Sequence, residues 1–460
     1  MRRRGVVLVA VLIVAALVAV IAASVMFRMR AEVAASAANT RGEQASEAAL
    51  SGIARAVTVL KASAGDSKLW YDNPDLFQNV LVADDASNKW YFTVYADPPE
   101  GQTTPRYGLT DEASKINLNT APQAVLLALP NMTAELVDCL LDYRGGGTEP
   151  RADGAKQDYY DQLPSPYVIP QGPLSTLEEL FLVKGFNAPA VWGEDANFNG
   201  ILDPNEDDGD ATFPPDDHDG RLNTGLRGVA TVYSSEPNTD KSGKARVNIS
   251  GDAAALKSIP GISQETAQFI QLYRAEGNTF KHPSELLELR YQLKEAPKDV
   301  PGLKQGSWIE SKVTGAELAT VLDRLTIATD PKKPITGLVN VNTAPPEVLA
   351  ALPGLDPNLA QQIVDARRDM ESDAKASIAW LYTQNLLDAA AFKSVAPYLT
   401  ARSYQYTVRC IGFGVPCGRY RVIEAVVDVS GKSPRVVYLR DISRLGLPFA
   451  LDVDSMERSQ

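Results

Sequence analysis

The first 60 residues form a helical pattern whose chemical character changes along its length. Residues 2–4 are arginines, an uncharged apolar run extends over residues 6–27, and two further arginines follow within three residues. A run of this length meets the ~20 residues that a helix needs to cross a membrane. It exceeds the apolar stretch of a cleavable secretory signal, which is roughly 7–15 residues. The leading arginines predict a cytoplasmic N-terminus.

The helical pattern continues beyond this membrane segment. Residues 31–62 are rich in Ala and contain no proline, and Leu50, Ile53, Val57 and Leu60 recur at three- and four-residue steps. That spacing creates one apolar face. The chain therefore predicts a single helix of about 55 residues, roughly 80 Å long at 1.5 Å per residue, that runs from the membrane into a soluble domain.

Three copies of one short pattern lie further along the chain. Each copy has an apolar residue and Asn, then a Leu-Pro or Ile-Pro pair, and an Arg 14 residues beyond that proline. The copies begin at Ile116, Val247 and Val339, and their arginines are Arg144, Arg274 and Arg367. Self-similarity of this kind indicates repeated supersecondary units. Polar caps and prolines start a helix and the Pro-Gly or Pro-Asn step ends it, which predicts helix-hairpin-helix units over residues 115–144, 245–290 and 338–368.

The C-terminal segment has the period of an antiparallel sheet. Residues 404–410 alternate apolar and polar side chains, as a half-buried strand does. Glycines and a proline at residues 412–418 predict a break, residues 419–429 a return strand and residues 435–440 a third strand. Together with residues 90–95, these strands predict a small sheet packed on the N-terminal helix.

The chain contains three cysteines, and two of them flank the predicted turn. In an oxidising compartment, Cys410 and Cys417 can close a short loop as a disulfide. Two reduced thiols, or pairing with Cys139, are the alternatives. Cys139 lies in an apolar helical segment of the first repeat, where the simplest interpretation is a small buried apolar residue.

Composition narrows the possible functions. The chain has 460 residues and a formal net charge of −12, which argues against a nucleic-acid backbone as its main partner because phosphate binding depends on Lys and Arg. It has only two histidines and no nucleophile elbow, zinc-binding helix motif or phosphate-binding loop. We therefore expect a protein that is not an enzyme.

Residues 195–206 fit a 12-residue calcium loop at every position. Calcium prefers oxygen ligands, and a glycine, Gly200, stands at the sixth position, where the loop turns sharply. The predicted ligands are Asp195, Asn197, Asn199, Ile201 through its carbonyl, Asp203 and Glu206. Prolines at 214 and 215 prevent a long exiting helix, so we expect a lone loop with a structural Ca²⁺ rather than an EF-hand pair.

The acidic stretch continues beyond this loop. Residues 194–219 hold ten carboxylates and no Lys or Arg, a density that repels itself unless a divalent ion is present. A second calcium site is therefore possible, with ligands from Asp207, Asp208, Asp210, Asp217 and Asp219. The alternative is a solvated acidic linker that binds nothing specifically.

Two features together resemble a known family. The Arg-Arg-Arg-Gly start followed by an apolar helix resembles a type IV prepilin leader, which would be cut after Gly5 so that Val6 becomes the methylated first residue. With the segment GLTDEASKINLN at residues 108–119, the chain resembles the type II secretion minor pseudopilin K, or general secretion pathway protein K. The resemblance implies a helical domain inserted into a pilin-like fold, and it implies that this helical domain binds calcium.

The resemblance implies an α+β fold, in which a long N-terminal transmembrane helix packs on a small antiparallel sheet and a large all-α helix-hairpin-helix domain is inserted. The predicted segments are a leader (1–5), a transmembrane or shaft helix (6–60), the first part of a pilin-like head (61–119), the inserted domain with its acidic calcium loop at 194–219 (120–400) and the C-terminal strands of the head (401–450). The region from 145 to 243 is longer and more acidic than the family implies, and one repeat is extra.

Ala10 departs from ordinary pilins in an informative way. Pilins usually carry Glu at the fifth mature position, and here that position is Ala10. A buried carboxylate without a partner is costly, so a subunit with no neighbour above it gains nothing from one. The K pseudopilins, which this chain resembles, also lack this Glu, and they lie at the pseudopilus tip. The resemblance thus implies a single-pass inner-membrane protein, mostly periplasmic, whose partners are other minor pseudopilins, the major pseudopilin, the inner-membrane secretion platform and secreted substrate.

A membrane-anchored DNA-binding protein is the main alternative, because such repeats also resemble those of DNA receptors. A phosphate-binding hairpin needs a close backbone approach, typically through Gly-hydrophobic-Gly. Here the second glycine position holds Thr133, Ser263 or Asp356, and Asp356 would repel a phosphate. We therefore interpret the hairpins as packing units and expect no nucleic-acid partner.

The leader yields the first testable prediction. We expect cleavage between Gly5 and Val6 and an N-methylated Val6, because the leader is short, basic and ends in glycine. N-terminal sequencing and mass spectrometry of membrane-extracted protein measure both. An intact Met1, or a start near Ala37, would indicate an ordinary anchor or a secretory signal instead.

Overall fold

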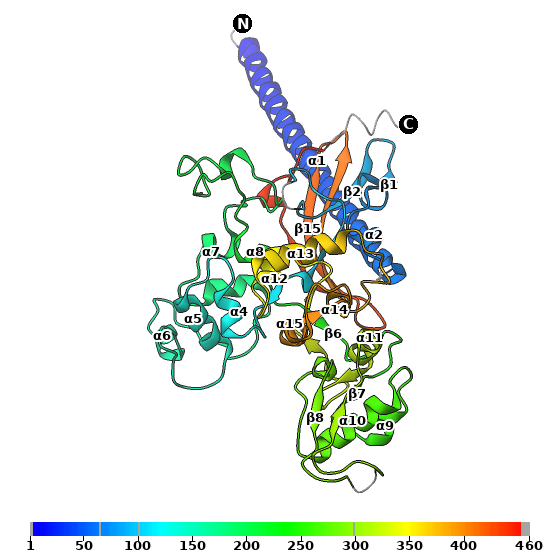
Figure 1. Cartoon of the computed structure of the whole chain (residues 1–460). Helices are drawn as coiled ribbons and strands as arrows, with labels where there is room; N and C mark the ends of the chain where they lie inside the picture. Colours follow the sequence, from blue (N-terminus) through cyan, green and yellow to red (C-terminus); the bar gives the residue numbers. More distant parts are fainter. Residues whose placement is uncertain (1–2, 64–65, 100–101, 298–299, 452–460) are drawn as a thin grey trace.

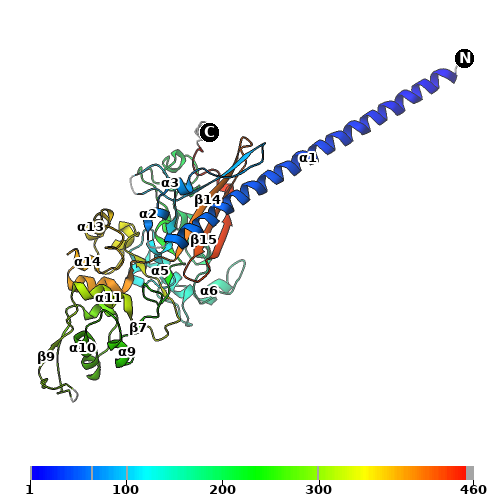
Figure 2. The same cartoon turned by 90° about the vertical axis from the view of Figure 1, so that its right-hand side faces the viewer.

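The computed structural model describes residues 3–63, 66–99, 102–297 and 300–451. Helix α1 (Arg3–Ser63) is continuous over 61 residues, as predicted. Its N-terminal half projects as a rod from the rest of the molecule, and its C-terminal half lies against a sheet (Figure 1, Figure 2). The structure is therefore α+β, with a long apolar helix packed on an antiparallel sheet.

The main sheet combines strands from both ends of the chain. In spatial order they are β1 (Val80–Asp84), β2 (Lys89–Tyr95), β14 (Gln405–Val415), β15 (Tyr420–Asp428) and β16 (Arg435–Asp441), all antiparallel, and β3 (Thr110–Asp111) pairs with the start of β14. Short helices α2 (Ser67–Trp70) and α3 (Pro74–Phe77) connect α1 to β1, and η6 (Ser443–Leu445) follows β16. The chain leaves the sheet after β3 and returns at β14.

Small residues allow α1 to approach the sheet closely. The buried face of α1 includes Ala45, Ala49 and Ile53. A Cβ atom built on Gly412 of β14 would lie 2.1 Å from the Ala45 carbonyl oxygen and 2.4 Å from the Ala49 nitrogen. On the helix side, a Cβ atom on Gly52 would lie 2.3 Å from the Cys410 sulfur. Helix and strand backbones therefore pack against each other with no room for a side chain at these points.

This packing corrects the prediction for the C-terminal strands. The glycines at 412 and 414 do not break the strand, because β14 continues through both to Val415. Glycine stands there because α1 and Trp90 occupy the space that a side chain would need. The strand is also buried on both faces rather than half-buried. On the face opposite α1, Arg409 lies against the acidic loop, and Ile411 and Phe413 pack with Ile442 and Phe449.

The inserted region between β3 and β14 contains three similar units, preceded by η1 (Glu112–Ser114). Each unit has a two-residue strand, a short helix, a longer helix and a closing strand that pairs in parallel with the first. Unit 1 (residues 115–234) comprises β4 (Ile116–Asn117), α4 (Gln123–Leu127), α5 (Ala134–Arg144), α6 (Gln157–Asp161), η2 (Leu177–Leu182), α7 (Ala188–Trp192), η3 (Pro204–Glu206), α8 (Gly225–Val229) and β5 (Ala230–Thr231).

The other two units follow the same order. Unit 2 (residues 245–329) comprises β7 (Val247–Asn248), α9 (Ala253–Lys257), α10 (Gln264–Ala275), η4 (Pro283–Leu286), β8 (Arg290–Gln292), β9 (Trp308–Glu310), α11 (Gly315–Arg324) and β10 (Leu325–Thr326). Unit 3 (residues 338–403) comprises β12 (Val339–Asn340), α12 (Pro346–Ala350), α13 (Pro357–Arg368), α14 (Trp380–Thr383), α15 (Ala389–Val395), η5 (Ala396–Tyr398) and β13 (Leu399–Thr400).

The repeated asparagine has the same structural role in each unit. Its side-chain oxygen accepts the backbone N–H two residues later, at 2.9 Å for Asn117, 2.7 Å for Asn248 and 3.0 Å for Asn340. This bond turns the chain out of the first strand toward the short helix.

The repeated arginine closes the same turn from the other side. Arg144 donates to the Ala121 carbonyl at 2.6 Å, Arg274 to the Gly251 carbonyl at 2.7 Å and Arg367 to the Val341 carbonyl at 2.7 Å. The arginine therefore ties the longer helix to the turn before the short helix. The sequence repeat reflects an internal brace of the fold.

Unit 2 enters and leaves through a narrow stem. Strands β6 (Ser235–Glu236) and β11 (Ile335–Thr336) pair antiparallel on either side of it. Both views place unit 2 at the end of the molecule farthest from the N-terminus (Figure 1, Figure 2). With this stem, the inserted region holds five two-stranded sheets among the residues that the structure describes, so it is mainly helical rather than all-α.

The close contact between α1 and β14 generates a prediction. Gly412→Ala should destabilise the detergent-solubilised protein by about 3 kcal/mol, the upper end of the usual cost of overpacking, because the new methyl group meets backbone atoms that cannot rotate away. Chemical denaturation followed by circular dichroism measures the change. Gly146→Ala is the matched control, since nothing lies within 4 Å of that position. Equal stability of the two variants would contradict the packing.

Candidate functional site

The acidic stretch forms a closed excursion between two short helices. Helix α7 ends at Trp192 and is capped by Gly193, and α8 begins at Gly225. At the base of the loop, Glu194 donates its backbone N–H to the Asn223 carbonyl at 2.8 Å. Asn223 in turn donates its N–H to the Glu194 carboxylate at 2.6 Å. These two bonds hold the ends of the loop together.

The first predicted calcium loop closes around two buried carboxylates. Asp195 and Glu206 are each 1% exposed. The Asp195 carboxylate accepts the backbone N–H groups of Asn199 and Gly200, both at 3.1 Å. Glu206 reaches back across the loop and accepts the N–H groups of Ala196 at 2.8 Å and Asp203 at 3.1 Å. The carboxylates of Asp195 and Glu206, at the first and twelfth positions, therefore hold the loop closed through its backbone N–H groups.

The intermediate positions gather around Asp203. The side-chain amides of Asn197 and Asn199 donate to the same Asp203 oxygen, at 2.8 and 3.0 Å. The Asn199 oxygen accepts the Ile201 N–H at 2.6 Å. Gly200 has a φ of +70°, the left-handed conformation that the sharp turn at position six requires. The structure thus brings the side chains of all five predicted side-chain ligands into one hydrogen-bonded loop.

The electrostatics of this loop favour a cation. Burial, with a smaller contribution from the neighbouring Asp195 and Asp203 carboxylates, raises the pKa of Glu206 to about 7, although two backbone N–H groups oppose the rise. Buried carboxylates need a compensating charge. The donor set consists of hard oxygen atoms, as Ca²⁺ requires, so the residues present fit that ion.

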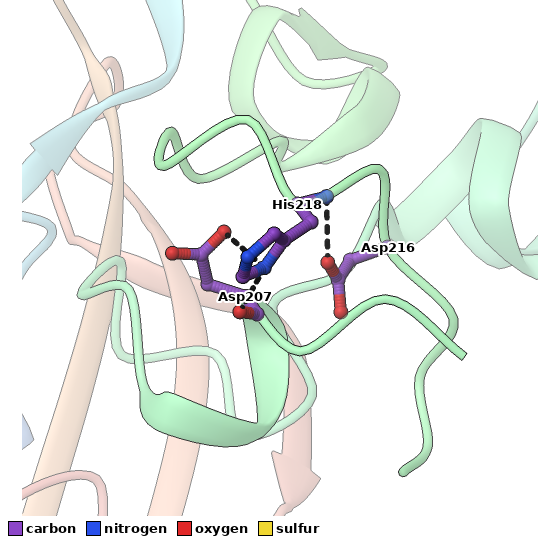
Figure 3. Close-up of side chains that lie close together, drawn as sticks. All are labelled: Asp207, Asp216 and His218. Carbon is purple, nitrogen blue, oxygen red and sulfur yellow. Dashed lines mark hydrogen bonds and ion pairs between the residues drawn. The ribbon is translucent and has the colours of Figure 1, made fainter. Parts of the chain in front are cut away.

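The second predicted site differs from the sequence expectation. Among the described residues, one set of three His, Cys, Asp or Glu side chains has its ligand atoms all within 4.8 Å of one another, and it consists of Asp207, Asp216 and His218 (Figure 3). Of the predicted ligands, only Asp207 belongs to it. Asp208 instead accepts the N–H and hydroxyl of Thr212, at 3.1 and 2.8 Å.

The remaining predicted ligands of that site lie apart from this set. Asp219 accepts the Arg221 N–H at 2.8 Å, and Asp210 and Asp217 are exposed. Asp216 organises the turn because it accepts the N–H groups of Asp208, Gly209 and His218. The Asp-x-His spacing at 216–218 was the signal in the sequence that could have identified it.

The acidic loop docks on the face of the sheet opposite α1. Arg409 of β14 donates to the Phe198 carbonyl at 2.9 Å, to Glu424 of β15 at 3.1 Å and to Asp97 after β2. Burial opposes ionisation of Asp97, yet Arg409 holds the pKa of that carboxyl below its usual range. The contacts with Asp97 and Phe198 could not be predicted from the sequence, because both residues are more than 200 positions from Arg409 along the chain.

Two further contacts attach the insert to the sheet. Arg440 of β16 bonds Glu424 at 2.8 Å and Glu178 of η2 at 2.6 Å. Asn199, inside the calcium loop, donates to the Pro448 carbonyl at 2.8 Å. The loop is therefore attached to the sheet and to the segment that follows the last strand.

The predicted disulfide between Cys410 and Cys417 is not formed in the structure, and it stays a prediction. Cys139, Cys410 and Cys417 are all free thiols. Cys410 lies in the interface with α1, and burial raises the pKa of its thiol. Cys417 lies beyond the end of β14 and packs near Trp90. Cys139 is buried in α5, as predicted.

The membrane segment is exposed along its length. Among the described residues, α1 is the one helix long and apolar enough to cross a membrane, and none of its most apolar 18-residue window is buried in the protein. Gly5, Val6 and Ala10 all lie within this helix. Cleavage and methylation at Gly5 and Val6 stay predictions.

Two segments match family models. Residues 114–192 and residues 339–409 match separate models, each described as type II secretion system (T2SS), protein K. They cover the first part of unit 1, and unit 3 with the start of β14. No curated protein matches the chain.

A solved structure, the GspK-GspI-GspJ complex from the enterotoxigenic Escherichia coli type 2 secretion system, matches 88% of this chain and 98% of its own at 12% identity. Its TM-score is 0.37, and we draw no conclusion from it. The two family matches are independent of that superposition and lie in the order and region that the sequence resemblance implied. Together they support the resemblance of this chain to protein K of the type II secretion system.

Proposed function

We propose that this chain is the minor pseudopilin at the tip of a type II secretion pseudopilus, where it initiates or caps assembly. The observation that carries this proposal is Ala10. The apolar run of α1 contains no acidic residue, so the helix offers no carboxylate to the N-terminal amine of a subunit above it. An elongating subunit needs that pairing, because a buried charge without a partner is costly.

The shape of the head supports the same position. The chain between β3 and β14 builds three units, and unit 2 lies at the end of the molecule farthest from the N-terminus (Figure 2). A head of this width is difficult to repeat at every step of a thin helical filament. At the tip it is not constrained by a subunit above. The expected partners are other minor pseudopilins, the major pseudopilin, the inner-membrane secretion platform and secreted substrate.

The proposal also places the chain in the inner membrane with most of its mass in the periplasm. One apolar helix at the N-terminus, preceded by arginines, fits a single pass in that orientation. The role is structural, through assembly rather than chemistry.

Copy number tests the tip position. We expect on the order of one copy of this chain per pseudopilus, and deletion of the chain should reduce the number of pseudopili without changing the composition of their shafts. Quantitative mass spectrometry of sheared pseudopili, with the major subunit as the reference, gives the ratio. Homopolymers of this chain, or a ratio near one to one, would overturn the proposal.

We further propose that residues 195–206 bind a structural Ca²⁺. Asp195, Asn197, Asn199, Ile201, Asp203 and Glu206 would hold it, and the ion would compensate the buried carboxylates of the loop. Because Arg409 contacts the Phe198 carbonyl, a rigid loop would also fix the insert on the sheet.

Calcium should therefore stabilise the protein. A ligand at 100 times its Kd adds about 2.7 kcal/mol when it binds only the folded chain. Thermal melting in EDTA and in millimolar Ca²⁺ measures the effect, which should disappear in Asp195→Ala plus Glu206→Ala. Asp210→Ala plus Asp217→Ala is the control, because it removes the same charge from exposed positions of the same stretch. An equal response of both double variants would mean that general acidity, and not this loop, attracts the ion.

A further inference from the structure

Arg227 contacts the first ligand position of the calcium loop. It lies in α8 and is only 7% exposed. Its Nη2 donates to Oδ2 of Asp195. The guanidinium carbon lies 4.4 Å from the centre of the Phe198 ring, so the side chain is held between the first and fourth residues of the loop.

The rest of this guanidinium is poorly satisfied. Nε and Nη1 of Arg227 are buried and have no hydrogen-bond partner among the residues that the structure describes. A buried donor without a partner costs free energy, so an arginine kept here must be compensated by another interaction. The ion pair with Asp195 provides that compensation. Among the described residues, Arg227 is also the one basic side chain that forms an ion pair with Asp195, Asp203 or Glu206.

A calcium ion and Arg227 would use the same carboxylate. Asp195 stands at position one of the loop, and its Oδ2 already binds Arg227 and the Gly200 N–H. A divalent ion placed beside this guanidinium would be repelled by it, since two cations a few ångströms apart interact strongly where water is excluded. Ion binding must therefore displace Arg227 or proceed against its charge.

Two other acids lie within electrostatic reach of Arg227. Asp97 and Glu424 belong to the sheet side of the interface and already bind Arg409. Burial opposes ionisation of both, whereas Arg409, and with it Arg227, lowers the pKa of each. A displaced guanidinium thus has carboxylates nearby, and they lie where the loop meets the sheet.

We propose that Arg227 is a resident counter-cation of the loop that competes with Ca²⁺ for Asp195 and so sets the calcium affinity. Once displaced, its charge is added to Asp97 and Glu424 and strengthens the contact between loop and sheet. This inference rests on the proposed calcium binding and adds a residue that the ligand pattern of the loop does not contain.

The test compares calcium affinity in Arg227→Met and the parent chain. Titration calorimetry on the full chain in detergent should show Ca²⁺ binding on the order of tenfold tighter, or more, in Arg227→Met, because a competing charge is gone. The melting temperature in EDTA should fall, because Asp195 has lost its counter-charge, and saturating Ca²⁺ should restore it. Arg227→Lys keeps the charge and should bind calcium close to the parent affinity.

Arg402→Met is the matched control. Arg402 pairs with the buried Glu236 at 3.0 Å, outside the calcium loop. Its loss should lower the melting temperature equally with and without calcium and leave the affinity unchanged. If Arg227→Met is folded only in the presence of Ca²⁺, the counter-cation role is supported by that rescue.

The opposing outcomes are distinct. Weaker calcium binding in Arg227→Met would mean that Arg227 orients Asp195 for the ion, and unchanged binding would mean that it has only a packing role. Either result overturns the competition while calcium binding by the loop stands. A parent chain that binds no calcium would overturn the calcium proposal itself, and the competition with it.

Discussion

The close contact between α1 and β14 is the constraint on which the rest of the structure depends. Alanines on the helix and glycines on the helix and strand bring two backbones together without side chains between them. One face of the sheet is thereby filled along the length of β14. Any large addition to the fold must attach to the opposite face, and the inserted region does so. The buried residues of α1 that allow this contact begin at Ala45, and the exposed membrane-spanning half of the helix lies before them.

The opposite face of the sheet is unusual because it is buried and charged. Arg409 lies on β14 with its guanidinium bonded to Asp97, Glu424 and the Phe198 carbonyl, and its side chain is almost fully enclosed. Breaking such a buried network by removing one partner is typically costly, because the remaining charge is left without compensation. The network therefore makes the position of the acidic loop and the integrity of the sheet depend on each other. A change in the charge of the loop would alter the electrostatics at β14 and β15, and this link is the physical basis for the proposed structural role of calcium.

The periodicity of the sequence predicted the local elements well, but it did not predict how segments far apart along the chain pack against each other. The long helix, the helix pair of each repeat and the strands around residues 90–95 and 404–440 followed from spacing alone. The strand β1 was missed because it is an exposed edge strand with no alternation of burial. Gly412 was interpreted as a breaker because the sequence does not reveal that a helix backbone lies against it. Likewise, the grouping of residues 195–206 in one closed loop is local and could be predicted, whereas Arg227, Asp216 and Arg409 act through contacts that only the tertiary fold creates.

The repeated unit explains how the head could grow without losing its fold. Each unit is closed by its own parallel strand pair and braced by its own asparagine and arginine, while one hydrophobic core runs through all three. Unit 2 is joined to the rest of the chain through the short β6–β11 stem, and neither family model covers it. Units 1 and 3, by contrast, are tied together and to the sheet, because Asp111 before unit 1 accepts from Asn340 and Ser403 of unit 3. Units 1 and 3 are therefore held in fixed positions, and parts of both match the family models. Unit 2 differs from them, because its strand β7 is more exposed than the corresponding strands β4 and β12. A change on the outer surface of unit 2 therefore leaves in place the Asp111 contacts that hold unit 3 to the start of the inserted region.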